Sequence, residues 1–192
     1  MILPIRAYGD PVLRKKGMDI SADYPNLGQL ISDMFETMNS ANGIGLAAPQ
    51  IGLDIRLFIV DVSPLATDED YADIADELKD FKKVFINAKI LEESGEEWKF
   101  NEGCLSIPEV REDVKRKDTI VIEYYDENFQ KHTETYSDIR ARVIQHEYDH
   151  IEGILFTDKI SSLKKKMIKG KLSKISNGEV HINYKMRFPN KK

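Results

Sequence analysis

Residues 137–153 read SDIRARVIQHEYDHIEG, and they predict the helix around which the rest of the chain can be interpreted. Ser137 is a favourable N-cap residue and Gly153 a favourable C-terminal stop. The side chains that share one side of this helix are Ile139, Val143, His146, His150 and, beside them, Ile151. Because the helix is unusually apolar around Val143 and Ile144, we expect it to be buried.

The segments on either side of this helix predict strands and two further helices. Apolar or alternating runs indicate strands at 56–62, 84–91, 97–100, 119–125 and 131–136, the last two forming a hairpin, and a short final strand at 180–184. Helical spacing predicts an N-terminal helix at 26–40 and a Lys-rich helix at 162–174, and 43–52 is too rich in Gly and Pro for a helix interior. The predicted fold class is α+β, with antiparallel β-sheets packed around the buried helix, an N-terminal helix and a basic C-terminal helix.

Length and composition restrict the class of protein. The 192 residues suit a single domain spanning 1–192, and 41% hydrophobic with 32% charged residues excludes collagen-like and largely disordered chains. No apolar run approaches the ~18 residues that a membrane helix needs, and the N-terminus lacks the layout of a secretory signal. Because Cys104 is the single cysteine, an internal disulfide is excluded and a cytoplasmic location is expected.

Charge is distributed unevenly along the chain. Residues 159–192 carry eleven Lys or Arg and one acid, a net charge of +10, whereas the remaining residues carry 17 basic and 32 acidic side chains, a net charge of -15. The acidic stretch at 63–83 is expected to be a surface insertion with about one helical turn, and 176–192 a C-terminal extension. The basic region is either a solvated face or a binding site for a polyanion.

The strongest chemical signal is His146-Glu147-Tyr148-Asp149-His150. Two His residues four apart point the same way from a helix, so both imidazoles can bind one metal ion. Glu147 can then accept a proton from water that the metal activates. The alternative is a pair of core histidines, which is less favourable because two imidazoles and a carboxylate would be buried without partners.

A metal site needs a third protein ligand, and the sequence offers several candidates. One protease class has a third His where this chain has Phe156, which cannot bind a metal. The remaining candidates are Cys104, His132 and His181. Cys104 is favoured because it lies in the stretch 101–108, which Gly and Pro interrupt, and because a thiolate binds divalent transition metals strongly, although a lone Cys is more often a buried apolar residue. One Cys and two His leave a fourth position open, as in catalytic metal sites.

Hydrolysis of an amide also needs hydrogen-bond donors for the oxyanion that forms. The side-chain amide of Gln50 and the backbone N–H of Leu105 are suitable donors. Taken alone, Gln50 would more often be an ordinary loop residue, and the Gly and Pro residues beside it shift that interpretation only modestly.

Three segments resemble the signature motifs of the peptide deformylase family. They are Gly43-Ile44-Gly45-Leu46-Ala47-Ala48-Pro49-Gln50, Glu102-Gly103-Cys104-Leu105-Ser106 and His146-Glu147-Tyr148-Asp149-His150. They occur in the family's order and roughly its spacing, and the likeness covers nearly the whole chain. The resemblance implies an enzyme that removes the N-formyl group from the N-terminal formyl-methionine of newly synthesised polypeptides and releases formate.

The resemblance also implies a role for each matching residue. Cys104, His146 and His150 would bind one divalent metal ion, with water in the fourth place, and Glu147 would move the proton. Gln50 and the Leu105 N–H, together with the metal, would share the charge of the carbonyl oxygen. The family's preference implies Fe²⁺, with Ni²⁺, Co²⁺ or Zn²⁺ as substitutes, although the ligand set alone suits zinc.

The expected substrate is a nascent N-formylmethionyl polypeptide, bound in an extended form along strand-like edges. The residues expected to bind it are Ile44, Gly45, Glu102, Arg111, Ile139 and Val143, with the three aliphatic side chains forming the methionine pocket. Glu102 and Arg111 suit either a structural ion pair or a substrate contact, and the orientation of Arg142 is left open.

Partners and rival functions follow from the same features. The basic C-terminal region suggests contact with the ribosome, where RNA is abundant, and neither DNA nor a membrane is expected as a partner. The main rival is a metallopeptidase that uses the same helix motif to cleave internal peptide bonds. The second is a binding module with a structural metal, which would have four protein ligands and no turnover.

Overall fold

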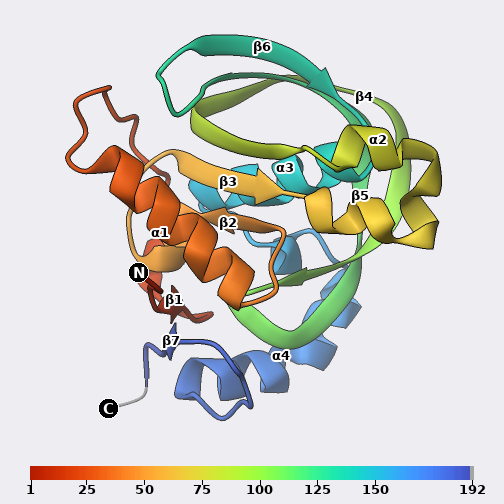
Figure 1. Ribbon diagram of the computed structural model, residues 1–192. Helices are drawn as coiled ribbons and strands as arrows, with labels where there is room; N and C mark the ends of the chain where they lie inside the picture. The colour runs from red at the N-terminus through yellow and green to blue at the C-terminus, as the bar shows by residue number, and fades with distance from the viewer. Residues whose placement is uncertain (191–192) are drawn as a thin grey trace.

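The computed structural model describes residues 1–190 (Figure 1). Its helices are α1 (Leu27–Ser40), α2 (Ala75–Leu78), α3 (Asp138–Ile151) and α4 (Ser162–Asn177), with 3-10 segments at Pro11–Arg14, Ala48–Ile51, Ser63–Thr67, Glu69–Ile74 and Phe156–Asp158. Its strands are β1 (Ile5–Arg6), β2 (Gly45–Ala47), β3 (Leu57–Asp61), β4 (Lys82–Cys104), β5 (Ile107–Tyr125), β6 (Lys131–Tyr136) and β7 (Met186–Arg187). The predicted mixture of helices and antiparallel strands is confirmed. None of the helices within residues 1–190 has the length and apolar character that crossing a membrane demands.

Five strands form one antiparallel sheet in the order β2-β3-β4-β5-β6. The longest pairing joins β4 to β5, and its register shifts at four places, the first between Ile86 and Lys89. Such bulges bend and twist a strand. Figure 1 shows β4 and β5 curving round α3. Strands β1 and β7 form a separate parallel pair, which attaches the C-terminal segment to the N-terminal one.

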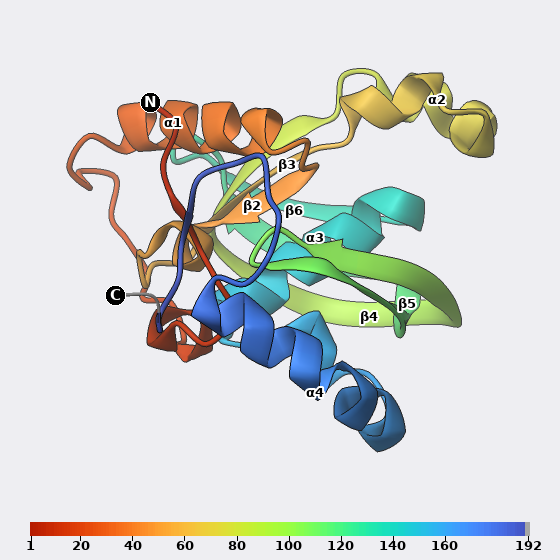
Figure 2. The ribbon, with the colours of Figure 1, turned by 90° about the horizontal axis from the view of Figure 1, so that it is seen from below.

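Strand β3 is buried on both faces, and its side chains alternate between two cores. Phe58 and Val60 belong to the core that contains the apolar side of α3, whereas Leu57 and Ile59 belong to the core that contains α1. Figure 2 shows α1 and α3 on opposite sides of β2 and β3. The continuous apolar run is therefore explained by a strand that is covered on both faces.

A third core lies between α4 and the turn of the β4–β5 hairpin. On α4 the buried side chains are Ile168, Leu172 and Ile175, and they pack with Ile107, Val110 and Val114 of β5. Most of the helix's lysines stay exposed. Removing α4 would therefore expose this core, so the role of the basic region has to be tested by substitution.

Helix α3 begins and ends close to the predicted residues. Ser137 is its N-cap, but the Ser137 side chain accepts no capping hydrogen bond, and Asp138 instead accepts the N–H of Arg140 at 2.9 Å. Gly153 follows the helix with φ +73°, and a Cβ there would lie 2.7 Å from the carbonyl oxygen of Arg14. Glycine is required at this stop because of both the left-handed backbone and the close neighbour.

Three local predictions are wrong. One continuous strand, β4, replaces the two predicted at 84–91 and 97–100, because the interruption between them is a bulge and not a turn. The segment 63–83 has two 3-10 segments and α2 in place of one helical turn. The last strand, β7, does not lie at 180–184, because its position is determined by pairing with β1 and not by local alternation.

Glu152, just beyond α3, ties the end of this helix to the sheet. Its carboxylate accepts a hydrogen bond from Arg56 at 2.5 Å and lies 3.0 Å from the Lys16 ammonium. Arg56 immediately precedes β3 and also donates to the Ala88 carbonyl of β4. Burial alone would raise the pKa of Glu152, but the hydrogen bonds from Arg56 and Lys16 lower it below its ordinary value.

We expect Glu152→Gln to lower the free energy of unfolding by roughly 1–2 kcal/mol near neutral pH, because it removes a charge-assisted bond from a buried arginine. Since the folded-state pKa is depressed, this stabilisation is present above the ordinary Glu pKa of 4.5 and is lost as the pH falls through the lower, folded-state value. Denaturant unfolding across this pH range measures the difference, with the exposed Glu69→Gln as control. A difference that did not shrink at acidic pH would contradict the assignment.

Candidate active site

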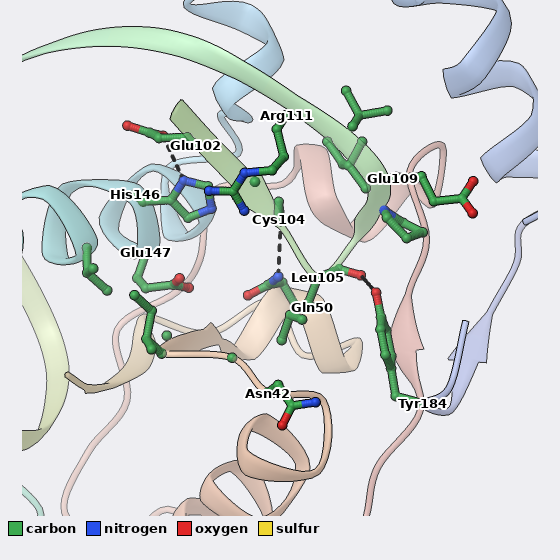
Figure 3. Close-up of a pocket in the computed structure, with 18 of the residues that line it drawn as sticks. Asn42, Gln50, Glu102, Cys104, Leu105, Glu109, Arg111, His146, Glu147 and Tyr184 are labelled. Carbon is green, nitrogen blue, oxygen red and sulfur yellow. Dashed lines mark hydrogen bonds and ion pairs between the residues drawn. The ribbon is translucent and has the colours of Figure 1, made fainter. Parts of the chain in front are cut away.

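Three potential metal ligands converge where the end of β4 meets α3. Figure 3 shows two of them, Cys104 and His146. Cys104 is the last residue of β4, and His146 and His150 lie one turn apart in α3. Their ligand atoms all lie within 4.8 Å of one another, and Sγ of Cys104 is 3.3 Å from Nε2 of His150. A thiolate with two imidazoles is the donor set of a nitrogen–sulfur transition-metal site. The residues present therefore fit a metal ion.

The other two candidate ligands lie outside this cluster. The Nε2 atom of His132 lies 2.8 Å from Asp126, and the His132 ring stacks on Tyr124 at the far end of the sheet. His181 is exposed in the segment that follows α4. The geometry thus favours Cys104 as the third ligand.

Glu102 orients His146 and pairs with two arginines, of which Arg116 also pairs with Asp149. Nδ1 of His146 lies 2.9 Å from the Glu102 carboxylate, which leaves Nε2 for the cluster. Arg116 donates to both Glu102 oxygens at 2.7 and 3.0 Å, and Arg142 donates at 2.9 Å. Burial alone would raise the pKa of Glu102, but the hydrogen bonds from His146 and Arg116 hold it well below its usual range. The carboxylate is therefore ionised, and His146 Nδ1 donates the hydrogen bond to it.

Arg142, whose orientation the sequence leaves open, points into the protein. It is 1% exposed, donates to the Trp98 carbonyl at 2.7 Å, and its guanidinium lies 4.4 Å from the centroid of the Trp98 ring. Arg111 behaves differently: it is exposed and donates to Asn101, not to Glu102. The ion-pair partners of Glu102 are thus Arg116 and Arg142.

Glu147 lies beside the metal ligands with its carboxylate against β2. It is 4% exposed, and Oε2 has no hydrogen-bond partner among residues 1–190. A Cβ at Gly45 would lie 2.8 Å from Cγ and Cδ of Glu147, so only glycine leaves room for the carboxylate there. Burial raises the pKa of Glu147 to about 7. A buried carboxyl with a free oxygen and such a pKa can exchange protons near neutral pH.

Gln50 points its amide at the same cluster. Its Nε2 donates to Sγ of Cys104 at 3.4 Å and to Oγ of Ser106 at 3.3 Å, while its Oε1 accepts the Ala47 N–H at 2.9 Å. Leu105 follows Cys104, and its carbonyl accepts the hydroxyl of Tyr184 at 2.8 Å. Both predicted oxyanion donors therefore lie next to Cys104.

These groups open onto a cavity of about 760 Å³. The predicted binding residues that line it are Ile44, Gly45, Glu102, Arg111 and Val143. Ile139 is not among the lining residues: it is 1% exposed and packs in the core with Phe85 and Tyr136. One helical turn separates Ile139 from Val143, and the sheet covers the former.

Comparison with known proteins identifies the family. The family model described as polypeptide deformylase matches residues 2–166. The chain belongs to the peptide deformylase family. It is 64% identical to the peptide deformylase of Christiangramia forsetii over 193 residues, covering 100% of this chain and 98% of the relative, and 61% identical to that of Flavobacterium johnsoniae over 189 residues, covering 98% and 96%.

Solved structures of this family have the same fold. The peptide deformylase from Legionella pneumophila is 35% identical, with a TM-score of 0.78 over 93% of this chain and 98% of that one. The peptide deformylase from Thermotoga maritima is 36% identical, with a TM-score of 0.73 over 84% and 99%. The predicted family and activity are confirmed: the chain is a peptide deformylase family enzyme, which removes the N-formyl group from nascent polypeptides. The family is metal-dependent, in agreement with the ligand cluster.

Sequence reasoning missed two parts of this enzyme's site. It did not identify Arg116, whose position in an alternating strand gives no sign that it is buried beneath Glu102. It also assigned 180–184 to a strand, whereas residues 181–184 line the cavity. No signal in the local sequence could have placed that segment, because its position depends on contacts with distant residues.

We expect Glu102→Gln to weaken metal binding by about 10–100-fold, because His146 would lose the carboxylate that orients its ring. Titration of the metal-free enzyme with Zn²⁺ against a competing chelator measures the affinity. Asp113→Asn, at an exposed position of β5, is the control. Metal affinity equal to that of the wild type would remove Glu102 from this role.

Proposed function

We propose that deformylation takes place at the cluster of Cys104, His146 and His150, with Glu147 as the group that moves the proton. The observation that best supports this is the buried Oε2 of Glu147, which has no hydrogen-bond partner in residues 1–190 and lies beside three convergent ligand atoms. A cluster with a structural metal alone would need a fourth protein ligand and no such carboxylate.

The chemistry follows from the positions of the side chains. A divalent ion held by the three ligands supplies Lewis acidity, which activates water and polarises the formyl carbonyl. Glu147 accepts a proton from the attacking water and passes it to the amine of methionine, so that the formyl C–N bond breaks and formate leaves. The Gln50 amide and the Leu105 N–H donate hydrogen bonds to the carbonyl oxygen as its negative charge develops.

The substrate binds as an extended chain beside β2. This strand lies at the edge of the sheet, so its outer side can pair with a peptide backbone except at the Ala47 N–H, which Gln50 holds. Backbone pairing of this kind explains tolerance of many sequences. Ile44 and Val143 form apolar walls for the methionine side chain, and Arg111 stands at the exposed rim of the cavity. Any residue larger than glycine at position 45 would displace Glu147.

The metal in the cell is Fe²⁺ under this proposal, in line with the family resemblance, and Ni²⁺, Co²⁺ or Zn²⁺ can take its place. Thiolate and imidazole ligands accept all four ions. Residues 1–192 act as one catalytic domain in the cytoplasm, where nascent chains emerge. The stretch 63–83 is an acidic surface insertion, and 176–192 is a C-terminal extension whose last residues, 191–192, lie outside the described part of the chain.

The lysines of α4 are proposed to contact ribosomal RNA. Lys166, Lys169 and Lys171 are exposed and have no hydrogen-bond or ion-pair partner among residues 1–190. Replacing all three with Gln should lower the affinity for ribosomes and make that affinity less sensitive to salt, because each lysine neutralises phosphate charge. Cosedimentation with ribosomes measures this. Undiminished binding by the folded triple variant would contradict the proposal.

We expect Glu147→Ala to retain the metal and to lose about 10²–10⁴-fold in kcat, because the proton transfer has no other carrier. Formate release from an N-formyl-methionyl tripeptide measures turnover, and elemental analysis measures the metal. The wild-type enzyme should release formate and leave internal peptide bonds intact. Cleavage of unblocked peptides without formate would favour a metallopeptidase, and an active Glu147→Ala variant would remove Glu147 from its role.

A further inference from the structure

The C-terminal segment forms one wall of the active-site cavity. The lining residues include His181, Ile182, Asn183 and Tyr184, together with the metal ligands Cys104 and His146. The match to the polypeptide deformylase family ends at residue 166, so this wall lies outside the part of the chain that matches the family. The residues of this wall therefore belong to none of the three catalytic motifs.

Two sets of bonds hold this segment in place. The hydroxyl of Tyr184 donates to the carbonyl of Leu105 at 2.8 Å, directly after the ligand Cys104. Immediately beyond, the Ile5 N–H donates to the Lys185 carbonyl at 2.9 Å, and β7 pairs with β1. The wall is thus anchored on both the active site and the N-terminal strand.

The segment presents unused polar groups. His181 and Asn183 are exposed, and neither side chain has a hydrogen-bond or ion-pair partner within residues 1–190. The backbone N–H and C=O groups from His181 to Asn183 likewise make no hydrogen bond to the described residues. Backbone groups left free beside a cavity can pair with the backbone of an extended peptide.

The direction of the substrate brings it to this wall. In Figure 3, Tyr184 lies on the opposite side of Cys104, Leu105 and Gln50 from His146 and Glu147. The formyl group is the end of the substrate, so every residue after the methionine must leave the metal cluster through the rest of the cavity. His181–Tyr184 border that remaining space together with Glu109 and Arg111 of the β5 hairpin arm.

We propose that His181–Tyr184 bind the second and third residues of the formylated peptide, so that this segment sets how strongly the enzyme prefers longer substrates. The inference rests on the proposed function, because it assumes that the formyl group is attacked at the metal cluster. The ligand is the extended peptide itself, which the segment recognises through amide and polar side-chain hydrogen bonds.

The test compares two substrates in the metal-loaded enzyme. These are N-formyl-methioninamide, which has no second residue, and an N-formyl-methionyl tripeptide. In the double variant His181→Ala/Asn183→Ala, the ratio of kcat/KM for the tripeptide to that for the amide should fall roughly three- to tenfold, as expected for one or two lost hydrogen bonds. The fall should come from a higher KM for the tripeptide. Tyr184→Phe, which frees the wall from Leu105, should lower the same ratio.

Lys185→Ala is the matched control, because Lys185 adjoins the wall without lining the cavity. Thermal unfolding shows that each variant is folded. The proposal would be overturned if the tripeptide-to-amide ratio of kcat/KM stayed at the wild-type value in both the folded His181→Ala/Asn183→Ala variant and the folded Tyr184→Phe variant. It would also be overturned if kcat/KM fell equally for both substrates. Wild-type enzyme that released no formate from either substrate would instead contradict the proposed function.

Discussion

The buried carboxylate of Glu102 is the interaction on which the rest of the site depends. It lies in β4, binds Arg116 of β5, and binds Arg142 and His146 of α3, so one charge joins the hairpin to the helix. A buried charge is tolerated only when paired and hydrogen-bonded, and losing one partner leaves the others uncompensated. The same network therefore fixes how α3 sits inside the curved sheet and which nitrogen of His146 faces Cys104.

Around this network, the groups assigned to the reaction and the far wall of the cavity come from different parts of the chain. The groups assigned to the reaction lie on α3, at the end of β4 and beside β2. Packing there is so close that only glycine at position 45 leaves room for the Glu147 side chain. The far wall of the cavity comes from residues 181–184, which are held by the bond from Tyr184 to Leu105, by the β1–β7 pair and by packing of Val180 and Tyr184 against neighbouring cores.

The sequence predicted those features that are local. Helix α3 and its paired His residues follow from periodicity and spacing, and the continuous apolar run from Leu57 to Val60 indicates a buried strand. Periodicity could not distinguish Val143, which lines the cavity, from Ile139, which the sheet covers. The inward orientation of Arg142 and the position of residues 181–184 also depend on distant partners, so no local pattern contains them.

The central claim is that one sulfur and two imidazole nitrogens bind a single metal ion. X-ray absorption spectroscopy of the enzyme loaded with one equivalent of Co²⁺ tests it directly. The account predicts one sulfur scatterer and two histidine nitrogens at the metal, with the sulfur signal absent in Cys104→Ala. A first coordination sphere without sulfur in the wild-type enzyme would contradict it.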